Sequence, residues 1–310
     1  MRREDADKWK EAVKNELSLL NENNKWTVSK LPEGKKAINS KWVFKVKRLG
    51  NNEIKYEARL VARGFEQKEN FDIHELYAPV AKLNTFRVFM SVATKLNLPV
   101  YQMDVCSAFL NSKIEEDVYL KLPEGIKLDN NKNAVYKLNK SIYGLKKSPR
   151  YWNQTFDEVV SSEGYVKSSK DCCLYTKCND SVKMFVLLYV DDILLFGNCN
   201  TEIRRLKEVL SKSFKMKDMG RITKYLGMNI EQDLEKGITK ISQTEYLKNI
   251  LEIYGMSECK PLSLPIDKNF KFDTLKRNKS ESKEIETECK KLIGCLMYAV
   301  MGSRPDRSAL

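Results

Sequence analysis

The chain has 310 residues, of which 42% are hydrophobic and 10% aromatic, values typical of a globular protein with a sizeable core. Its formal net charge of +13 at pH 7 favours a polyanionic partner, nucleic acid before a membrane surface. The sequence holds no run of 18 apolar residues, no apolar signal-peptide core and no cysteine–histidine zinc pattern. It therefore predicts an intracellular, non-secreted protein without a membrane span.

The N-terminal part predicts a helix followed by a basic hairpin. Apolar residues at helical spacing predict an amphipathic helix over residues 7–20. Strands are expected over 41–47 and 56–63, around a turn at "LGNNE". The stretch 35–68 carries ten Lys or Arg against three Glu, interleaved with apolar residues. This pattern indicates strands with a basic face for nucleic acid, and a merely solvated basic face is the alternative.

The middle of the chain alternates helices and strands. Over residues 100–230 the expected order is strand, helix, strand, strand, helix, strand, which is typical of a ferredoxin-like split sheet. A helix over 85–96 precedes it, and a helix over 244–254 follows. The elements of the series are a strand over 100–105, a helix opened by Ser148 and Pro149, a hairpin over 183–190 and 193–196, a helix capped by Thr201, and a closing strand over 224–230.

The hairpin places two aspartates in apolar surroundings, "LLYVDDILLF". Asp191 and Asp192 are expected at its tip, with Asp104 at the end of the neighbouring first strand. Burying unpaired carboxylates costs several kcal/mol or raises their pKa values. A divalent cation removes this conflict, and oxygen-only ligands select Mg²⁺ or Mn²⁺. The alternative is an Asp-Asp pair that serves only as a turn.

Several ordered motifs then carry a resemblance. "YVDD" is similar to the catalytic box of reverse transcriptases, and "QMDVCSAFLN" resembles their first aspartate motif. "KSIYGLKKSPRYW" resembles the segment that lines the nascent base pair, and "KYLGMNI" the primer-holding strand. "ARLVARGFEQ", "MKDMG" and "LIGCLMYAVMGSRPD" narrow the match. Together they resemble the polymerase region of a copia-type LTR retrotransposon Pol polyprotein, truncated before the ribonuclease H domain.

The resemblance implies an α+β (α/β) right-hand polymerase with fingers, a ferredoxin-like palm and a partial thumb. The implied division is an N-terminal helix over 1–25, fingers over 26–84 and 111–147, palm over 85–110 (first strand and preceding helix) and 148–232, and a partial thumb over 233–310.

The implied activity is RNA-directed DNA polymerisation. A primer 3′-hydroxyl attacks the α-phosphorus of a dNTP, and pyrophosphate leaves. The resemblance implies two Mg²⁺ or Mn²⁺ ions, bridged by the catalytic Asp104 and Asp191, with support from Asp192 and the carbonyl of Val105. Two ions stabilise charge on the attacking and leaving oxygens in such reactions.

The resemblance also assigns the substrate contacts. Phe109, five residues after Asp104, matches the bulky residue under the sugar that excludes a 2′-hydroxyl; an ordinary core Phe is the alternative. Lys217 is a candidate general acid for pyrophosphate, with a solvated lysine as the alternative. The other expected contacts are Lys55, Arg59, Gly144 and Lys146 for the nucleotide, and Tyr189, Val190, Tyr225, Leu226 and Gly227 for primer and template.

Departures from the family pattern leave rivals open. Glu57 stands where the family usually has Lys, and Lys147 where it usually has Gln. Glu57 weakens the expected cationic site. One rival is a truncated or domesticated remnant that binds nucleic acid without polymerising, and another is a two-metal nucleotidyl cyclase. The expected partners are an RNA template, a DNA primer and dNTP, with no membrane; the expected location is cytoplasmic, in retroelement particles, or nuclear.

Overall fold

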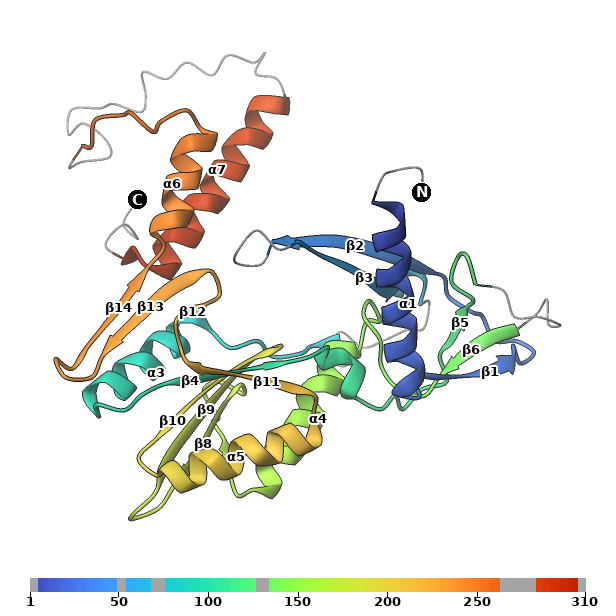
Figure 1. Ribbon diagram of the computed structural model, residues 1–310, viewed down its shortest axis with the longest axis horizontal. Coiled ribbons are helices and arrows are strands. Elements are labelled where there is room, and N and C mark those ends of the chain that lie inside the picture. Colours follow the sequence, from blue (N-terminus) through green and yellow to red (C-terminus); the bar gives the residue numbers. More distant parts are fainter. Residues whose placement is uncertain (1–4, 49–53, 68–75, 127–133, 263–282, 306–310) are drawn as a thin grey trace. The chain divides into compact units, whose positions relative to one another are not determined.

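The computed structural model describes residues 5–48, 54–67, 76–126, 134–262 and 283–305. These residues form a mixed α+β protein that divides into two compact units (Figure 1). The first unit comprises Met1–Ala81 and Gln102–Met219, and the second Lys82–Tyr101 and Gly220–Leu310. The turn predicted at "LGNNE" lies outside the described residues. The division into fingers, palm and thumb stays a prediction.

In the first unit, the predicted N-terminal helix and the predicted pair of basic strands are confirmed. Strands β2 (Ser40–Arg48) and β3 (Ile54–Ala62) pair antiparallel, with Val43 opposite Arg59. Helix α1 (Ala6–Glu22) packs on this sheet, where the Trp9 ring meets Phe44 edge-on at 5.2 Å. Successive strand residues point to opposite faces, so one face of the hairpin packs under α1 and the other carries the charged side chains.

A small sheet and two short 3₁₀ helices complete this end of the first unit. Strands β1 (Trp26–Lys30), β6 (Ala134–Leu138) and β5 (Tyr119–Lys121) form an antiparallel sheet. Its apolar residues share a core with α1 and β3, including Leu20, Leu60 and Leu120. The 3₁₀ helices are η2 (Gly64–Glu66) and η3 (Ala108–Asn111).

The second sheet of this unit carries the acidic hairpin. Six strands follow the order β11-β4-β10-β9-β8-β7, so the first strand of the series lies beside the central hairpin, as the ferredoxin-like prediction requires. Helix α4 (Ser148–Ser162) packs on β8 through Phe156 and Tyr175, and α5 (Asn200–Ser213) packs on β10. The strands are β4 (Tyr101–Val105), β7 (Val166–Lys167), β8 (Leu174–Cys178), β9 (Lys183–Tyr189), β10 (Asp192–Gly197) and β11 (Met216–Arg221).

Three details of the predicted series are wrong. The closing strand of the sheet is β11, whereas the predicted strand over 224–230 is broken at Leu226 and Gly227 into two strands of another sheet. Lys147 rather than Ser148 precedes α4, and the Ser148 hydroxyl donates to the Ile142 carbonyl at 2.6 Å. Cys199, not Thr201, precedes α5. The Ser148 hydroxyl is engaged by Ile142, and a turn at Leu226 and Gly227 breaks the predicted strand; neither feature is visible in the sequence pattern.

The second unit joins a helix, a small sheet and a helix pair. Phe86 of α3 (Leu83–Lys95) stacks on Tyr225 with ring centroids 4.6 Å apart. Tyr246 of α6 meets Tyr298 of α7 edge-on, with ring centroids 4.8 Å apart. The remaining elements are β12 (Lys224–Tyr225), β13 (Met228–Asp233), β14 (Ile238–Ser242), α6 (Thr244–Ile253) and α7 (Lys283–Gly302).

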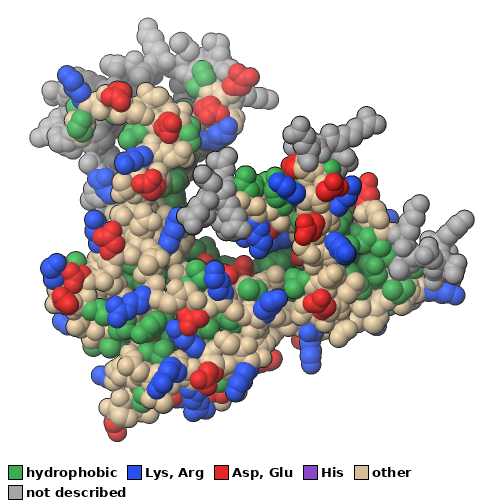
Figure 2. All heavy atoms as spheres, in the orientation of Figure 1, with side chains coloured by type: hydrophobic (Ala, Val, Ile, Leu, Met, Phe, Trp, Pro, Cys, Tyr) green, Lys and Arg blue, Asp and Glu red, His purple; other side chains and the backbone are tan. Residues whose placement is uncertain are grey.

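Charge is spread over the surface of the first unit. Figure 2 shows Lys and Arg side chains over α5, interspersed with acidic ones. Two of these cations are paired, Arg205 with Glu163 at 2.8 Å and Lys207 with Asp218 at 2.9 Å. Among the described helices, none has the length and hydropathy that crossing a membrane requires.

Candidate active site

The predicted aspartates lie at the ends of neighbouring strands of the six-stranded sheet. Asp104 is on β4, and Asp191 and Asp192 are at the tip of the β9–β10 hairpin. The Val105 N–H donates to the Asp191 carbonyl oxygen at 2.8 Å, which ties the end of β4 to the tip. Strands 4.7–4.9 Å apart bring side chains at their ends close together. Tertiary pairing therefore joins residues that are far apart in the chain.

The electrostatics of this cluster are unfavourable without a cation. Burial, together with the negative charge of Asp104, raises the pKa of Asp191 to about 6. Burial also raises the pKa of Asp192, which a hydrogen bond from Gln102 partly offsets. The Gln102 Nε2 donates to the Asp192 Oδ1 at 2.8 Å. Crowded carboxylates of this kind favour protonation or a bound cation.

One oxygen atom in the cluster is left without a partner. The Oδ1 of Asp191 is buried and accepts no hydrogen bond. Buried carboxylate oxygens are otherwise hydrogen-bonded, so an orphaned one calls for an explanation, and a cation is one. The donor set of carboxylates and backbone carbonyls suits Mg²⁺ or Mn²⁺.

The three carboxylates do not converge as expected. Within the described parts of the chain, no three His, Cys, Asp or Glu side chains form a group that could hold a metal ion. Asp104 raises the pKa values of both Asp191 and Asp192, but Gln102 holds Asp192. Asp191 lies in the turn, and Asp192 begins β10. The structure thus brings Asp104 next to the hairpin tip and holds Asp192 through Gln102.

The basic face of the β2–β3 hairpin acts on Asp191. The register puts Lys45 opposite Glu57 and Lys47 opposite Lys55, on the same face as Arg59. The positive charges of Arg59 and Lys47 lower the pKa of Asp191. Sequence alone could not rank the ten basic residues of 35–68, and the structure singles out Arg59 and Lys47.

A ring system links that face to the predicted sugar gate. The Arg59 guanidinium lies over the Tyr143 ring, 5.0 Å from its centroid. Tyr143 meets Phe109 edge-on at 5.4 Å. Burial, together with the charge of Asp191, raises the pKa of Tyr143 to about 12. Tyr143 was not among the predicted site residues; its place just before Gly144 in "KSIYGLKK" was the available signal.

Two glycines dock this loop against the end of β3. A Cβ on Gly144, whose φ is +92°, would lie 2.1 Å from the Ala62 carbonyl oxygen, and one on Gly64 would lie 2.1 Å from the Gly144 carbonyl oxygen. The Ala62 N–H donates to the Tyr143 carbonyl at 2.8 Å. Gly144 therefore allows backbone to pack on backbone; its expected approach to a template base stays a prediction.

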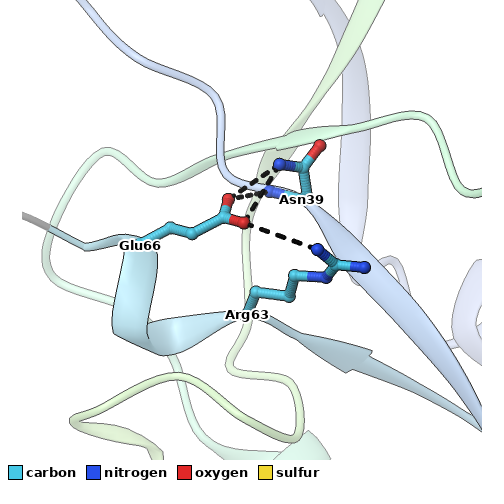
Figure 3. A network of polar contacts seen from close by, with 3 residues as sticks. All are labelled: Asn39, Arg63 and Glu66. Carbon is cyan, nitrogen blue, oxygen red and sulfur yellow. Dashed lines mark hydrogen bonds and ion pairs between the residues drawn. The ribbon is translucent and has the colours of Figure 1, made fainter.

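Hydrogen bonds and an ion pair surround the contact between Gly64 and Gly144. The Lys146 Nζ donates to the Gln67 carbonyl at 2.8 Å, so this predicted nucleotide contact points toward η2. Figure 3 shows the Glu66 carboxylate accepting from the backbone and side-chain amides of Asn39, at 2.8 and 2.9 Å, with Arg63 3.9 Å away. The Asn39 N–H is the main cause that lowers the pKa of Glu66. These bonds hold the start of β2 to the end of β3.

The glutamate that departs from the family pattern is paired within the basic face. Glu57 lies 2.9 Å from the Lys47 Nζ and 3.6 Å from the Lys55 Nζ. Burial opposes ionisation of Glu57, yet these lysines lower its pKa overall. Lys55, a predicted nucleotide contact, is thus engaged by Glu57, while Arg59 rests on Tyr143.

The remaining predicted contacts fall in both units. Tyr189 and Val190 precede Asp191 at the hairpin tip, and Lys217 is exposed on β11 of the first unit. Tyr225, Leu226 and Gly227 belong to the second unit, where Leu226 and Gly227 turn between β12 and β13 with φ of +45° and +76°. Tyr298 of α7 donates its hydroxyl to the Leu226 carbonyl. That bond fixes the turn from the C-terminal helix.

Comparison with known proteins identifies the family. A family model described as "Reverse transcriptase (RNA-dependent DNA polymerase)" matches residues 23–268. The chain is 38% identical over 302 residues to the retrovirus-related Pol polyprotein from transposon TNT 1-94 of Nicotiana tabacum, covering 95% of this chain and 23% of the relative. It is 30% identical over 304 residues to the corresponding polyprotein from transposon RE1 of Arabidopsis thaliana, covering 97% and 20%.

A solved foamy viral protease–reverse transcriptase in complex with double-stranded DNA covers 78% of this chain and 36% of that chain, with a TM-score of 0.39 and 11% identity. The chain spans about a fifth of the length of the curated polyproteins it matches. On the family match and the sequence identity, the chain belongs to the reverse transcriptase (RNA-dependent DNA polymerase) family of copia-type retrotransposon Pol polyproteins.

Proposed function

We propose that this chain catalyses RNA-templated DNA synthesis at the Asp104–Asp191 pair. The observation that carries the proposal is the orphaned Oδ1 of Asp191, next to Asp104 and facing Arg59 and Lys47 of the basic face. A half-buried acidic pair opposite a cationic surface suits a reaction in which a polyanionic nucleotide meets bound divalent ions. Family membership supports nucleotidyl transfer as the reaction class.

The proposed architecture is a right hand. The six-stranded sheet with α4 and α5 would be the palm, β2–β3 with the β1–β6–β5 sheet the fingers, and residues 233–310 the partial thumb. The ferredoxin-like strand order and the basic hairpin support the first two assignments. The predicted boundaries at residues 25, 84, 110, 147 and 232 are kept in this proposal.

Asp104, Asp191 and the carbonyl of Val105 would hold the divalent ions, with Asp192 as support. When bound, two ions stabilise charge on the attacking and leaving oxygens of a phosphoryl transfer. Gln102 keeps Asp192 in a fixed orientation through its 2.8 Å hydrogen bond. Arg59 and Lys47 favour the ionised form of Asp191, and so keep the pair ready to accept a cation.

The other residues of the cluster would bind and orient the substrates. Arg59, which lies over the Tyr143 ring, would attract the triphosphate. Phe109 is half-buried rather than fully buried, which leaves part of its ring available to a nucleotide sugar. Tyr189 and Val190 would contact the primer end, and Tyr225 to Gly227 its backbone. Lys217 would donate a proton to the leaving pyrophosphate.

One observation favours a second function. Glu57 engages Lys47 and Lys55, two cations of the face that a triphosphate would need. A protein with a partly neutralised face could bind nucleic acid and yet use dNTP poorly. The remnant that binds without polymerising is therefore the second candidate.

Primer extension on a homopolymer RNA template with Mg²⁺ or Mn²⁺ tests the proposal. The wild-type chain should extend a DNA primer, and Asp191→Asn should not. Binding of an RNA–DNA hybrid without extension under either metal would favour the remnant. If the chain shows no binding of the hybrid and no extension of the primer, both candidate functions are overturned.

A further inference from the structure

The tip of the β9–β10 hairpin is held in a strained conformation. Val190 has φ of +53°, in the left-handed region that β-branched residues rarely adopt. Strained backbone of this kind persists only where surrounding contacts enforce it. Val190 directly precedes Asp191, so its conformation sets the direction of that carboxylate.

The contact that enforces the conformation comes from a helix. The indole Nε1 of Trp152, on α4, donates to the Val190 carbonyl at 2.7 Å. Trp152 is 2% exposed, and its ring is fixed edge-on against Phe214 at 5.0 Å. A donor locked in this way holds the acceptor at one position, which a mobile side chain could not do.

A second tie holds the other side of the tip. The Val105 N–H donates to the Asp191 carbonyl at 2.8 Å, directly after Asp104. The two hydrogen bonds fix adjacent carbonyl groups: α4 donates to that of Val190, and β4 donates to that of Asp191. The Val105 amide therefore reports on whether the tip is in place.

We propose that Trp152 is a positioning residue, whose indole N–H holds the strained Val190 so that Asp191 faces Asp104. The proposal deepens the proposed function, because it rests on Asp191 as a metal-binding carboxylate. Trp152 itself touches neither substrate nor metal. A tryptophan that served only to pack the core would act through the shape of its ring, and its indole N–H would not matter.

Two variants separate the hydrogen bond from the packing. Trp152→Phe removes the N–H but leaves a smaller ring. Replacement of Trp152 by 3-benzothienylalanine keeps the two-ring shape and removes only the donor. Trp26→Phe is the matched control, because the Trp26 indole also donates a hydrogen bond, to the Asn21 Oδ1 at 3.1 Å, in a different sheet.

The first measurement is amide hydrogen exchange, which needs no metal. Both variants at position 152 should speed exchange of the Val105 amide at least fivefold, equivalent to about 1 kcal/mol. The amides of Leu187 and Leu194, paired further down the hairpin, should be unchanged. Trp26→Phe should change none of the three.

The second measurement is Mn²⁺ binding by calorimetry. The benzothienylalanine variant should bind Mn²⁺ at least fivefold more weakly than wild type at unchanged melting temperature. The inference is overturned if the benzothienylalanine variant exchanges the Val105 amide at the wild-type rate and binds Mn²⁺ with wild-type affinity. This holds whatever Trp152→Phe does to stability. If wild type and Asp191→Asn bind Mn²⁺ equally, the proposed metal site fails, and Val105 exchange alone then decides the role of Trp152.

Discussion

Two antiparallel hairpins of the first unit carry the charges of the candidate site in opposite ways. In β2–β3 the charges alternate with apolar residues along the strands, and the face that bears Lys45 and Lys47 is open. In β9–β10 the strand interiors are apolar on both faces, and Ile193 to Phe196 are fully buried. The acidic charges of that hairpin are confined to the tip. The basic charges are therefore numerous and cost little desolvation free energy, whereas the acidic charges are few and half-buried.

The difference shows what each hairpin requires from a partner. Exposed lysines are solvated in the absence of a bound anion, and Glu57 pairs with two of them, so the basic face needs no partner to be stable. The Asp191 carboxylate has lost solvation, and its pKa rises to about 6. Only the acidic tip thus needs a bound cation for full ionisation. Substitutions in the two hairpins should accordingly differ in kind and in size.

The largest effect is expected at the acidic tip. Asp191→Asn should lower polymerase activity at least about 10³-fold, the scale of losing a charge stabiliser at a reacting centre. The metal-free variant should be as stable as wild type or more so, because a buried, crowded charge is removed. Primer extension and thermal melting measure the two outcomes.

The matched control for the tip is Asp117→Asn, an exposed aspartate paired with Lys137 at 2.7 Å. It should leave extension within about twofold of wild type. Extension by Asp191→Asn at the wild-type rate would contradict the assignment of the tip.

The second-largest effect is expected where the basic hairpin packs against the loop that contains Gly144. Gly144→Ala should destabilise the protein by about 3 kcal/mol or more, because a Cβ there meets the Ala62 carbonyl at 2.1 Å and φ is +92°. Gly125→Ala isolates the backbone effect, since Gly125 has φ of +88° but nothing within 4 Å. It should cost about 1 kcal/mol. Urea unfolding gives both values, and equal losses would show that the close approach is unimportant.

A lysine outside both hairpins sharpens the contrast between solvated and buried charge. Lys25 is 1% exposed, and burial lowers its pKa from 10.5 to about 7, with a contribution from Lys140. Between these values the unfolded chain binds the proton and the folded chain does not, so stability rises with pH. From pH 7 to 9 the gain should be about 2 kcal/mol.

Lys25→Met should abolish this pH dependence in chemical unfolding and raise stability at pH 7. Lys30→Met, at an exposed lysine of β1, should leave the dependence as in wild type. A flat profile in the wild-type protein would show that Lys25 remains solvated.

Phe109, whose ring contacts Tyr143 beside Arg59 of the basic hairpin, should control sugar choice. Phe109→Ala should reduce the preference for deoxy- over ribonucleotides about tenfold, equivalent to about 1.4 kcal/mol, because it opens space for a 2′-hydroxyl. Single-nucleotide incorporation with dNTP and NTP measures the ratio. Phe156→Ala, at a fully buried ring on α4, should lower stability without changing the ratio. If Phe109→Ala behaves in the same way, Phe109 is a core residue.

The smallest effect is expected on the open face. Glu57→Gln releases Lys47 and Lys55, and should strengthen binding of an RNA–DNA hybrid about two- to fivefold. One further neutralised phosphate should steepen the log–log salt dependence by about 0.9. Glu22→Gln, at an exposed residue of α1, is the control. An unchanged salt slope would mean that nucleic acid does not contact this face.

Much of the fold and part of the site were predictable from local patterns. Alternation and helical spacing predicted α1, the β2–β3 hairpin, α3, α6 and the β9–β10 hairpin. The same patterns missed β11 and merged β12 with β13, because a turn at Leu226 and Gly227 leaves little mark on hydrophobic periodicity. The basic stretch 35–68 was evident, but its two faces depend on strand register, which only pairing defines.

The sequence by itself determined the chemistry that is available: three aspartates in apolar strands, a basic hairpin and the motif order of a reverse transcriptase. Only the tertiary structure decided how these groups meet. It brought Asp104 next to the hairpin tip, held Asp192 through Gln102, put Arg59 over Tyr143, and brought Trp152 to the Val190 carbonyl. Residue type and spacing govern local conformation, whereas contacts between distant segments depend on packing and hydrogen bonds that no local pattern records.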